Sequence, residues 1–84
     1  MGVKAIEFRN ELMKIITIAK EGNKEYVDVK SGDLHSKVGG YLGKNHSMPS
    51  CCSVMRQMMG NRDVIVNQPP KGNGATLIIR YYLG

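Results

Sequence analysis

Hydrophobic residues recur with a helical period in the first quarter of the chain. Between residues 3 and 21 they follow one another at steps of three and four positions. They are Ala5, Phe8, Leu12, Ile15, Ile16 and Ala19. This spacing predicts an amphipathic helix, and Gly22 with Asn23 ends it because both residues tolerate a left-handed backbone.

A short strand and a short helix are predicted next. Residues 26–29 alternate between polar and apolar, with the two valines on one face. Ser31 is suited to cap the helix that follows, because a serine hydroxyl can accept a hydrogen bond from a free helix amide. Gly39 and Gly40 supply the flexible backbone at which that helix ends.

A turn over residues 41–48 leads into a third helix, predicted at residues 49–59, whose two sides differ. Pro49 suits its first position, since that residue needs no amide donor. One side gathers sulfur-containing residues, which are Cys51, Cys52, Met55, Met58 and Met59. The other side is polar and carries Ser50, Ser53 and Gln57, with Arg56 at its flank. We predict that the sulfur side packs inward and that the polar side is exposed.

The last third of the chain is predicted to form a long hairpin. Residues 63–68 and 76–83 are rich in β-branched and aromatic side chains, and the second segment alternates. Its inward face would carry Leu77, Ile79, Tyr81 and Leu83. Residues 69–75 contain two prolines and two glycines, so they cannot continue a strand and are expected to form a basic loop.

The order of these elements is helix, strand, helix, turn, helix, strand, loop, strand. This is the order of a winged helix-turn-helix domain, an α+β fold of three helices and a small antiparallel sheet. The early strand is expected to join the hairpin as a third strand. Because 84 residues support one modest core, residues 1–84 are expected to form a single domain.

Charge is distributed unevenly along the chain. Residues 1–33 balance six basic against six acidic groups, so the net charge of +5 comes entirely from residues 34–84. That half carries Lys37, Lys44, Arg56, Arg62, Lys71 and Arg80 against Asp63 alone. A positive field concentrated in this way favours a polyanionic partner, although surface charge can also serve solubility alone.

Other features predict a cytoplasmic protein without a membrane partner. No apolar run approaches the ~20 residues that span a bilayer, and Met1 leads into an amphipathic pattern rather than a signal peptide. Cys51 and Cys52 are neighbours, so a disulfide between them would be strained and could not join distant parts of the fold. A reducing compartment suits this usage.

The sequence is a poor match to three kinds of chemical site: a nucleotide-binding loop, a zinc site and a cysteine nucleophile. Gly43-Lys44 resembles part of a nucleotide-binding loop, but Val38 and Asn45 stand where that loop needs glycine and Ser or Thr. Zinc would have to use His35, His46, Cys51 and Cys52. Neighbouring cysteines on a helix, however, point about 100° apart. A cysteine nucleophile beside His46 would need a pocket. We therefore expect no catalysis, cofactor or metal, and core positions for the cysteines.

The remaining reading is that the third helix is presented to double-stranded DNA. Ser50, Ser53 and Gln57 would meet base edges in the major groove. Residues expected to hold the phosphate backbone are Lys44, Arg56, Arg62 and Lys71. Asn45, His46 and Ser47 precede the helix, where its first amides favour phosphate. Asn73 would sit at the wing. The alternative is a protein-docking module that binds no nucleic acid, and a partner protein or a homodimer remains compatible with both.

Two stretches, "SGDLHSKVGGYLGKNHSMPSCCSVMRQMM" and "QPPKGNGATLIIRYYL", resemble a small bacterial winged-helix domain family. The family includes stand-alone uncharacterised proteins and chains described as HNH (histidine-asparagine-histidine) endonucleases, and the similarity covers residues 26–83. It implies a DNA-binding domain with a regulatory or accessory role in DNA processing, and not a nuclease. Leu42 and Ser47 stand where relatives carry proline and arginine, which weakens the phosphate contact expected there.

Overall fold

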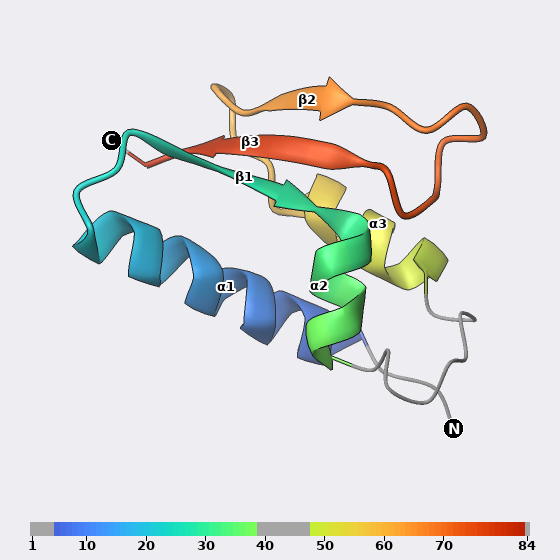
Figure 1. The fold of residues 1–84 in the computed structure, drawn as a ribbon, viewed down its shortest axis with the longest axis horizontal. Helices are drawn as coiled ribbons and strands as arrows, with labels where there is room; N and C mark the ends of the chain where they lie inside the picture. Colours follow the sequence, from blue (N-terminus) through green and yellow to red (C-terminus); the bar gives the residue numbers. More distant parts are fainter. Residues whose placement is uncertain (1–4, 39–47, 84) are drawn as a thin grey trace.

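A computed structural model describes residues 5–38 and 48–83 of the chain. These residues form an α+β arrangement of three helices and one three-stranded antiparallel sheet (Figure 1). The elements are α1 (Ala5–Glu21), β1 (Tyr26–Lys30), α2 (Ser31–Val38), α3 (Met48–Gln57), β2 (Val64–Asn67) and β3 (Ile78–Tyr82). Within the described ranges, no helix is both long and apolar enough to cross a membrane.

The helices and strands lie where the hydrophobic pattern predicts them, with small differences at their ends. α3 begins one residue before Pro49 and ends at Gln57. β3 begins at Ile78 and not at residue 76, because the residues before it pair with another element. Both the Ala75 and Leu77 carbonyls accept hydrogen bonds from amides at the start of α2. The predicted turn over residues 41–48 and the glycine pair before it lie almost wholly outside the described residues.

The sheet has the strand order β1-β3-β2, so the early strand joins the hairpin as its third strand, as predicted. β1 pairs with β3 along its whole length, from Tyr26 opposite Tyr82 to Lys30 opposite Ile78. β2 pairs with the other edge of β3 and has an irregularity between Ile65 and Asn67. Both β1 and β2 are therefore edge strands.

One hydrophobic core lies between the helices and one face of the sheet. α1 contributes Phe8 and Leu12, α2 contributes Leu34, the strands contribute Val29, Ile79 and Tyr81, and Leu77 comes from the loop just before β3. α3 contributes Cys51, Cys52, Val54 and Met55, all fully or almost fully buried. Met58 and Met59 are half-buried against the same core. The prediction that the sulfur side of this helix packs inward is confirmed.

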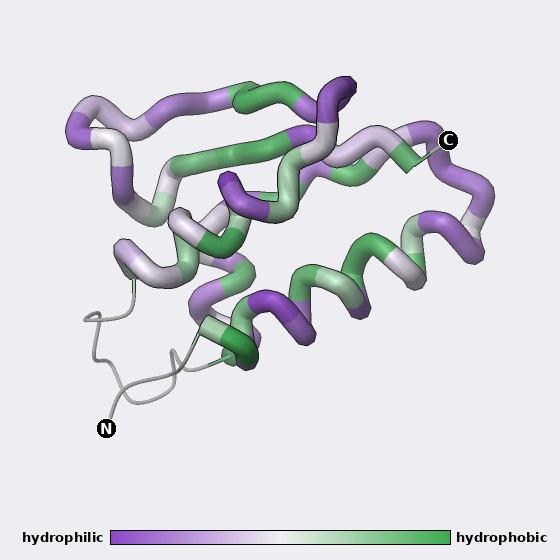
Figure 2. The backbone as a smooth tube through the Cα atoms, turned by 180° about the vertical axis from the view of Figure 1, so that it is seen from behind, coloured by the Kyte–Doolittle hydropathy of each residue, from purple (hydrophilic) through white to green (hydrophobic). Residues whose placement is uncertain are grey.

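The two broad faces of the molecule present different elements. β1 and α2 lie in front of α3 in Figure 1, whereas α3 lies in front when the molecule is seen from behind in Figure 2. The β2–β3 loop, residues 68–77, projects beyond the sheet at the end nearest the start of α3. This arrangement places α3 and the loop together and leaves the edge of β1 on the opposite face.

Candidate nucleic-acid interface

The exposed flank of α3 is polar, as its sequence predicts. Ser50, Ser53 and Gln57 are all exposed, at positions that recur every three to four residues along one side of the helix. Gln57 donates from Nε2 to Ser53 Oγ at 3.4 Å, and its Oε1 accepts from Arg9 of α1 at 3.4 Å. The flank therefore offers hydroxyl and amide groups with a guanidinium beside them.

Arg56 joins this helix to the β2–β3 loop. Its Nη1 donates to Asn73 Oδ1 at 2.8 Å, and its Nη2 donates to the Gly72 carbonyl. Gly72 has a φ of 86°, a left-handed conformation that glycine adopts without steric cost. The sequence suggested a phosphate contact for Arg56, and the structure shows its guanidinium turned to the loop.

The start of α2 holds the other limb of the same loop. The Ser31 hydroxyl and the Cys52 thiol both donate to the Gly74 carbonyl, the thiol at 3.5 Å. The Gly32 amide donates to Ala75 O at 3.1 Å. A Cβ on Gly32 would lie 3.0 Å from that oxygen, so this close approach requires glycine. We call these contacts, between Ser31, Gly32, Cys52 and Arg56 and residues 72–77, the loop junction.

The sequence did not reveal the role of Ser31. It was expected to cap α2, but the bond that its hydroxyl donates runs to Gly74, 43 positions further along the chain. Its amide also donates to Leu77 O at 2.8 Å. A serine at a helix start satisfies the pattern of a cap, so the local sequence carries no sign of this second use. Ser31 and Gly74 come together only because the β2–β3 loop folds back onto the start of α2.

The two cysteines are buried and free of disulfide bonds. Cys51 Sγ donates to the Ser31 carbonyl at 3.6 Å. Burial, and secondarily the neighbouring Cys52, raises the pKa of the Cys51 thiol to about 12. This thiol is therefore protonated at neutral pH, which is the opposite of what an activated cysteine nucleophile requires. Both cysteines occupy core positions, as predicted.

The four residues considered for zinc are only partly described, because His46 lies outside the described residues. His35 is buried with its ring 5.7 Å from that of Phe8, and among the described residues its Nε2 meets no hydrogen-bond partner. Within residues 5–38 and 48–83, no group of three or more His, Cys, Asp or Glu residues is placed to hold a metal ion. Among the described residues, His35, Cys51 and Cys52 are therefore buried side chains and not members of a metal-binding cluster.

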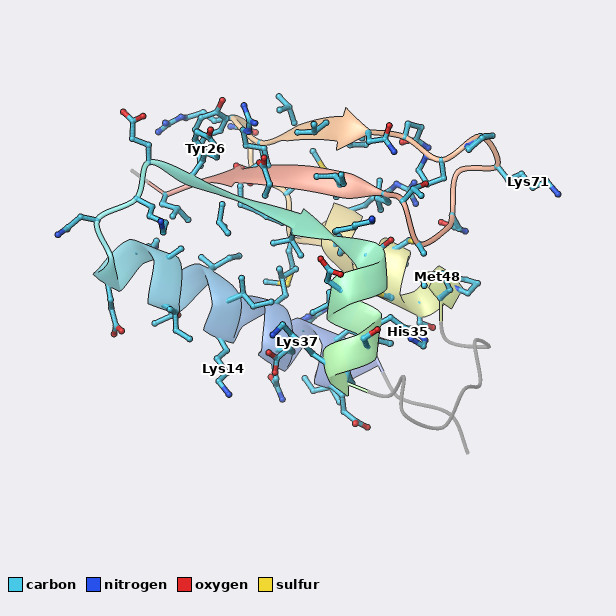
Figure 3. All side chains as sticks on the ribbon, viewed as in Figure 1. Lys14, Tyr26, His35, Lys37, Met48 and Lys71 are labelled. Atoms are coloured by element: carbon cyan, nitrogen blue, oxygen red, sulfur yellow. The ribbon has the colours of Figure 1, made fainter. Side chains whose placement is uncertain are left out.

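The basic residues predicted to hold phosphates are spread over the molecule. Lys71 is exposed and extends away from the tip of the β2–β3 loop (Figure 3). Arg62 lies at the opposite end of the hairpin, with its guanidinium 5.3 Å from the centre of the Tyr82 ring. Lys44, Asn45, His46 and Ser47 lie outside the described residues. The structure thus joins Arg56 to Asn73 of the loop that carries Lys71, and leaves Ser50, Ser53 and Gln57 on the exposed flank of the same helix. Arg62 lies apart from both.

Comparisons of the chain with protein-family models, with curated proteins and with solved structures find no match.

Proposed function

We propose that this chain is a winged helix-turn-helix domain that binds double-stranded DNA, with α3 in the major groove and the β2–β3 loop as the wing. The element order and the strand order β1-β3-β2 support this fold. The proposed role is regulatory, or accessory to a DNA-processing system. Catalytic turnover forms no part of it.

The observation that carries the proposal is the fixed position of the loop beside the exposed flank of α3. Arg56 binds two neighbouring loop residues from the last turn of the helix, and Cys52 binds Gly74 from its middle. A winged helix reads DNA with a helix and a loop at once, so the two have to keep a constant separation. The loop junction supplies that constraint, and its residues on α2 and α3 are buried or half-buried.

Each side chain of the proposed interface has a separate part. Ser50, Ser53 and Gln57 are proposed to meet base edges, for which hydroxyl and amide groups are suitable donors and acceptors. Arg9 and Lys71 are proposed to hold the phosphate backbone on either side of the helix. Arg56 is proposed to hold the wing through Asn73 rather than to contact DNA itself. Arg62 lies at the far end of the hairpin and is left out of the interface.

The segment before α3 completes the proposed interface. Lys44, Asn45, His46 and Ser47 come directly before the helix in the sequence. Amide groups at a helix start and a nearby lysine favour phosphate, so this segment is proposed to follow the DNA backbone. With Lys71, Arg9 and Lys44 as cations, about four phosphate contacts are expected, if the helix start supplies one of them.

Fluorescence anisotropy with a labelled random-sequence duplex tests this proposal. A protein that makes about four phosphate contacts should lose roughly a hundredfold in affinity between 50 and 200 mM salt. Lys71→Ala should weaken binding to all sequences and lower the slope of the salt dependence by about one. Lys20→Ala, at the far end of α1, is the matched control. Absent binding at low salt, or an affinity that ignores salt, would favour the docking module instead.

A further inference from the structure

A groove lies on the face of the molecule opposite the exposed flank of α3. It has a volume of about 380 Å³ and runs between the last turns of α1, the strand β1 and the helix α2. Its floor is mostly apolar and includes Ile15, Ala19, Val27 and Leu34. Ile18 also lines it and is 59% exposed, so an apolar side chain of this groove remains in water. The size lies within the range of ligand-binding clefts.

The edge of β1 beside this groove has unused backbone hydrogen-bonding groups. Leu83 N donates to Glu25 O at 2.9 Å and Ser31 N donates to Leu77 O at 2.8 Å, which ties both ends of β1 to β3. Residues of an antiparallel strand alternate in the edge to which their amides and carbonyls point. The groups of Tyr26, Asp28 and Lys30 therefore point away from β3. Among the described residues, no backbone partner meets them.

The charges around the groove favour an acidic ligand. Lys24, Lys30 and Lys37 line it, and within the described part of the chain none of the three forms an ion pair. Lys37 lies on the side of α2 that faces α1 (Figure 3). Two acids line the groove, and the Asp28 carboxylate is held by Arg80 at 2.8 and 3.0 Å, so within the described part of the chain Asp33 is the lining acid without an ion pair. Three lysines without an ion pair therefore line the groove, against one such acid, Asp33.

We infer that this groove, with the edge of β1, binds an extended segment of a partner protein in which apolar and acidic residues alternate. The segment adds to the sheet as a fourth strand, and its backbone meets the free groups of Tyr26, Asp28 and Lys30. Alternate side chains of an added strand point to opposite faces. The apolar ones fill the groove above α1, and the acidic ones lie on the outer face of the sheet, which is the face that carries Lys30.

The other edge of the sheet offers less to such a segment. β2 exposes Val64, Ile65 and Val66, but an irregularity interrupts its pairing at this point, and the groove described above lies at the other edge. Bulges of this kind protect edge strands from adding further strands. β1 pairs regularly over five residues and has both an apolar floor and a basic rim. The Ile65 amide therefore serves as an internal control for the choice of edge.

The probe is a blocked seven-residue peptide in which four valines alternate with three glutamates. It is titrated into the whole ¹⁵N-labelled chain, and amide hydrogen exchange is followed by NMR. At saturation the exchange of the Asp28 amide should slow at least about tenfold, since that amide gains a hydrogen bond. The exchange of the Ile65 amide should not change. A peptide with proline at its centre should bind about tenfold more weakly, because it lacks one donor.

Charge variants test whether the peptide is bound through the lysines of the groove or through non-specific attraction to a basic protein. The double variant Lys30→Glu, Lys37→Glu should bind the glutamate peptide about tenfold more weakly, while Lys71→Glu at the loop tip should leave it unchanged. All three lysines are exposed, so the variants should fold, which circular dichroism checks. Binding without protection of Asp28, equal binding of the proline peptide or of a lysine-for-glutamate peptide, or no binding at millimolar peptide overturns the inference. DNA binding enters none of these outcomes.

Discussion

The loop junction and the groove beside β1 meet at the start of α2, where Ser31 and Gly32 hold the loop and Lys30 and Asp33 line the groove, and they differ in how their polar groups are bound. At the junction, a buried hydroxyl, a buried thiol and a guanidinium converge on consecutive loop residues. At the groove, three lysines form no ion pair and alternate backbone groups of β1 meet no backbone partner within the described residues. Buried groups therefore hold a loop in place at the junction, while the edge of β1 has backbone groups that a further strand could bind.

The largest expected difference between the two regions is in thiol reactivity. Burial raises the pKa of Cys51, the core thiol next to the junction, to about 12. In the native chain at mildly alkaline pH, the cysteines should react with a disulfide reagent about a thousandfold more slowly than in concentrated urea. A cysteine introduced in the groove by Ile18→Cys should react at the rate of a free thiol, since Ile18 is exposed. Rapid native labelling of Cys51 or Cys52 would contradict the sealed junction.

A larger side chain at Gly32, which lies close to the loop, should produce the next largest effect, a loss of stability. Gly32→Val would place a Cβ 3.0 Å from the Ala75 oxygen and 3.2 Å from the Ala75 Cβ. Overpacking of this kind destabilises a fold by ~1–3 kcal/mol, which urea unfolding measures. Gly60→Val is the control, since its Cβ would meet only the Asp63 carboxylate at 3.6 Å. Equal free energies of unfolding for both variants would mean that the loop is not held against α2.

Loss of a single buried hydroxyl should have a smaller effect. Ser31→Ala removes the donor to the Gly74 carbonyl, and leaving buried polar groups unsatisfied costs about 1–3 kcal/mol. We expect the lower half of that range, because the Cys52 thiol still donates to the same carbonyl. Ser36→Ala changes an exposed serine of the same helix and should stay within ~0.5 kcal/mol. An unaltered unfolding midpoint for Ser31→Ala would show that the contact carries no stability.

The smallest effect is expected on the groove side, at the ion pair of Asp28 and Arg80. The hydrogen bond from Arg80 lowers the pKa of the Asp28 carboxyl. A depressed pKa in the folded state contributes stability above the usual carboxylate pKa of about 4, and this is lost as pH falls through the folded value. Both side chains are partly exposed, so Asp28→Asn should cost less than ~1 kcal/mol at neutral pH.

Urea unfolding at several pH values measures the contribution of the Asp28–Arg80 ion pair to the free energy of unfolding. The gap between the unaltered chain and Asp28→Asn should close in strong acid, where the carboxyl of the unaltered chain is also protonated. A gap that persists there would assign the effect to the amide itself and not to the ion pair. A gap larger than that of Ser31→Ala would reverse the ranking of the two regions.

Much of the fold could be predicted from local pattern. The stripe that begins with Phe8 and Leu12, the alternation along β3, and the glycines and prolines between elements identify each helix and strand. The two sides of α3 were also predictable, because a helix places residues three and four apart on one side whatever surrounds it. The exposure of Ser53 and the burial of Met55 both follow from that periodicity.

The interface was predicted less completely, since its polar contacts join distant positions. Charge alone suggested Arg56 and Arg62 as equivalent phosphate contacts, yet one binds the loop beside α3 and the other stacks on Tyr82 at the far end of the hairpin. Nothing within a few residues of either arginine distinguishes them. Their different surroundings arise from the return of the hairpin across the helices.

The order of residues was enough to predict the elements and their inward faces, because these follow from the period of helices and strands. That Ser31 holds a loop 43 positions away, and that the free groups of β1 open onto an apolar groove, depends on the folded chain. Such relations depend on which surfaces meet when the core closes, and no local pattern encodes them.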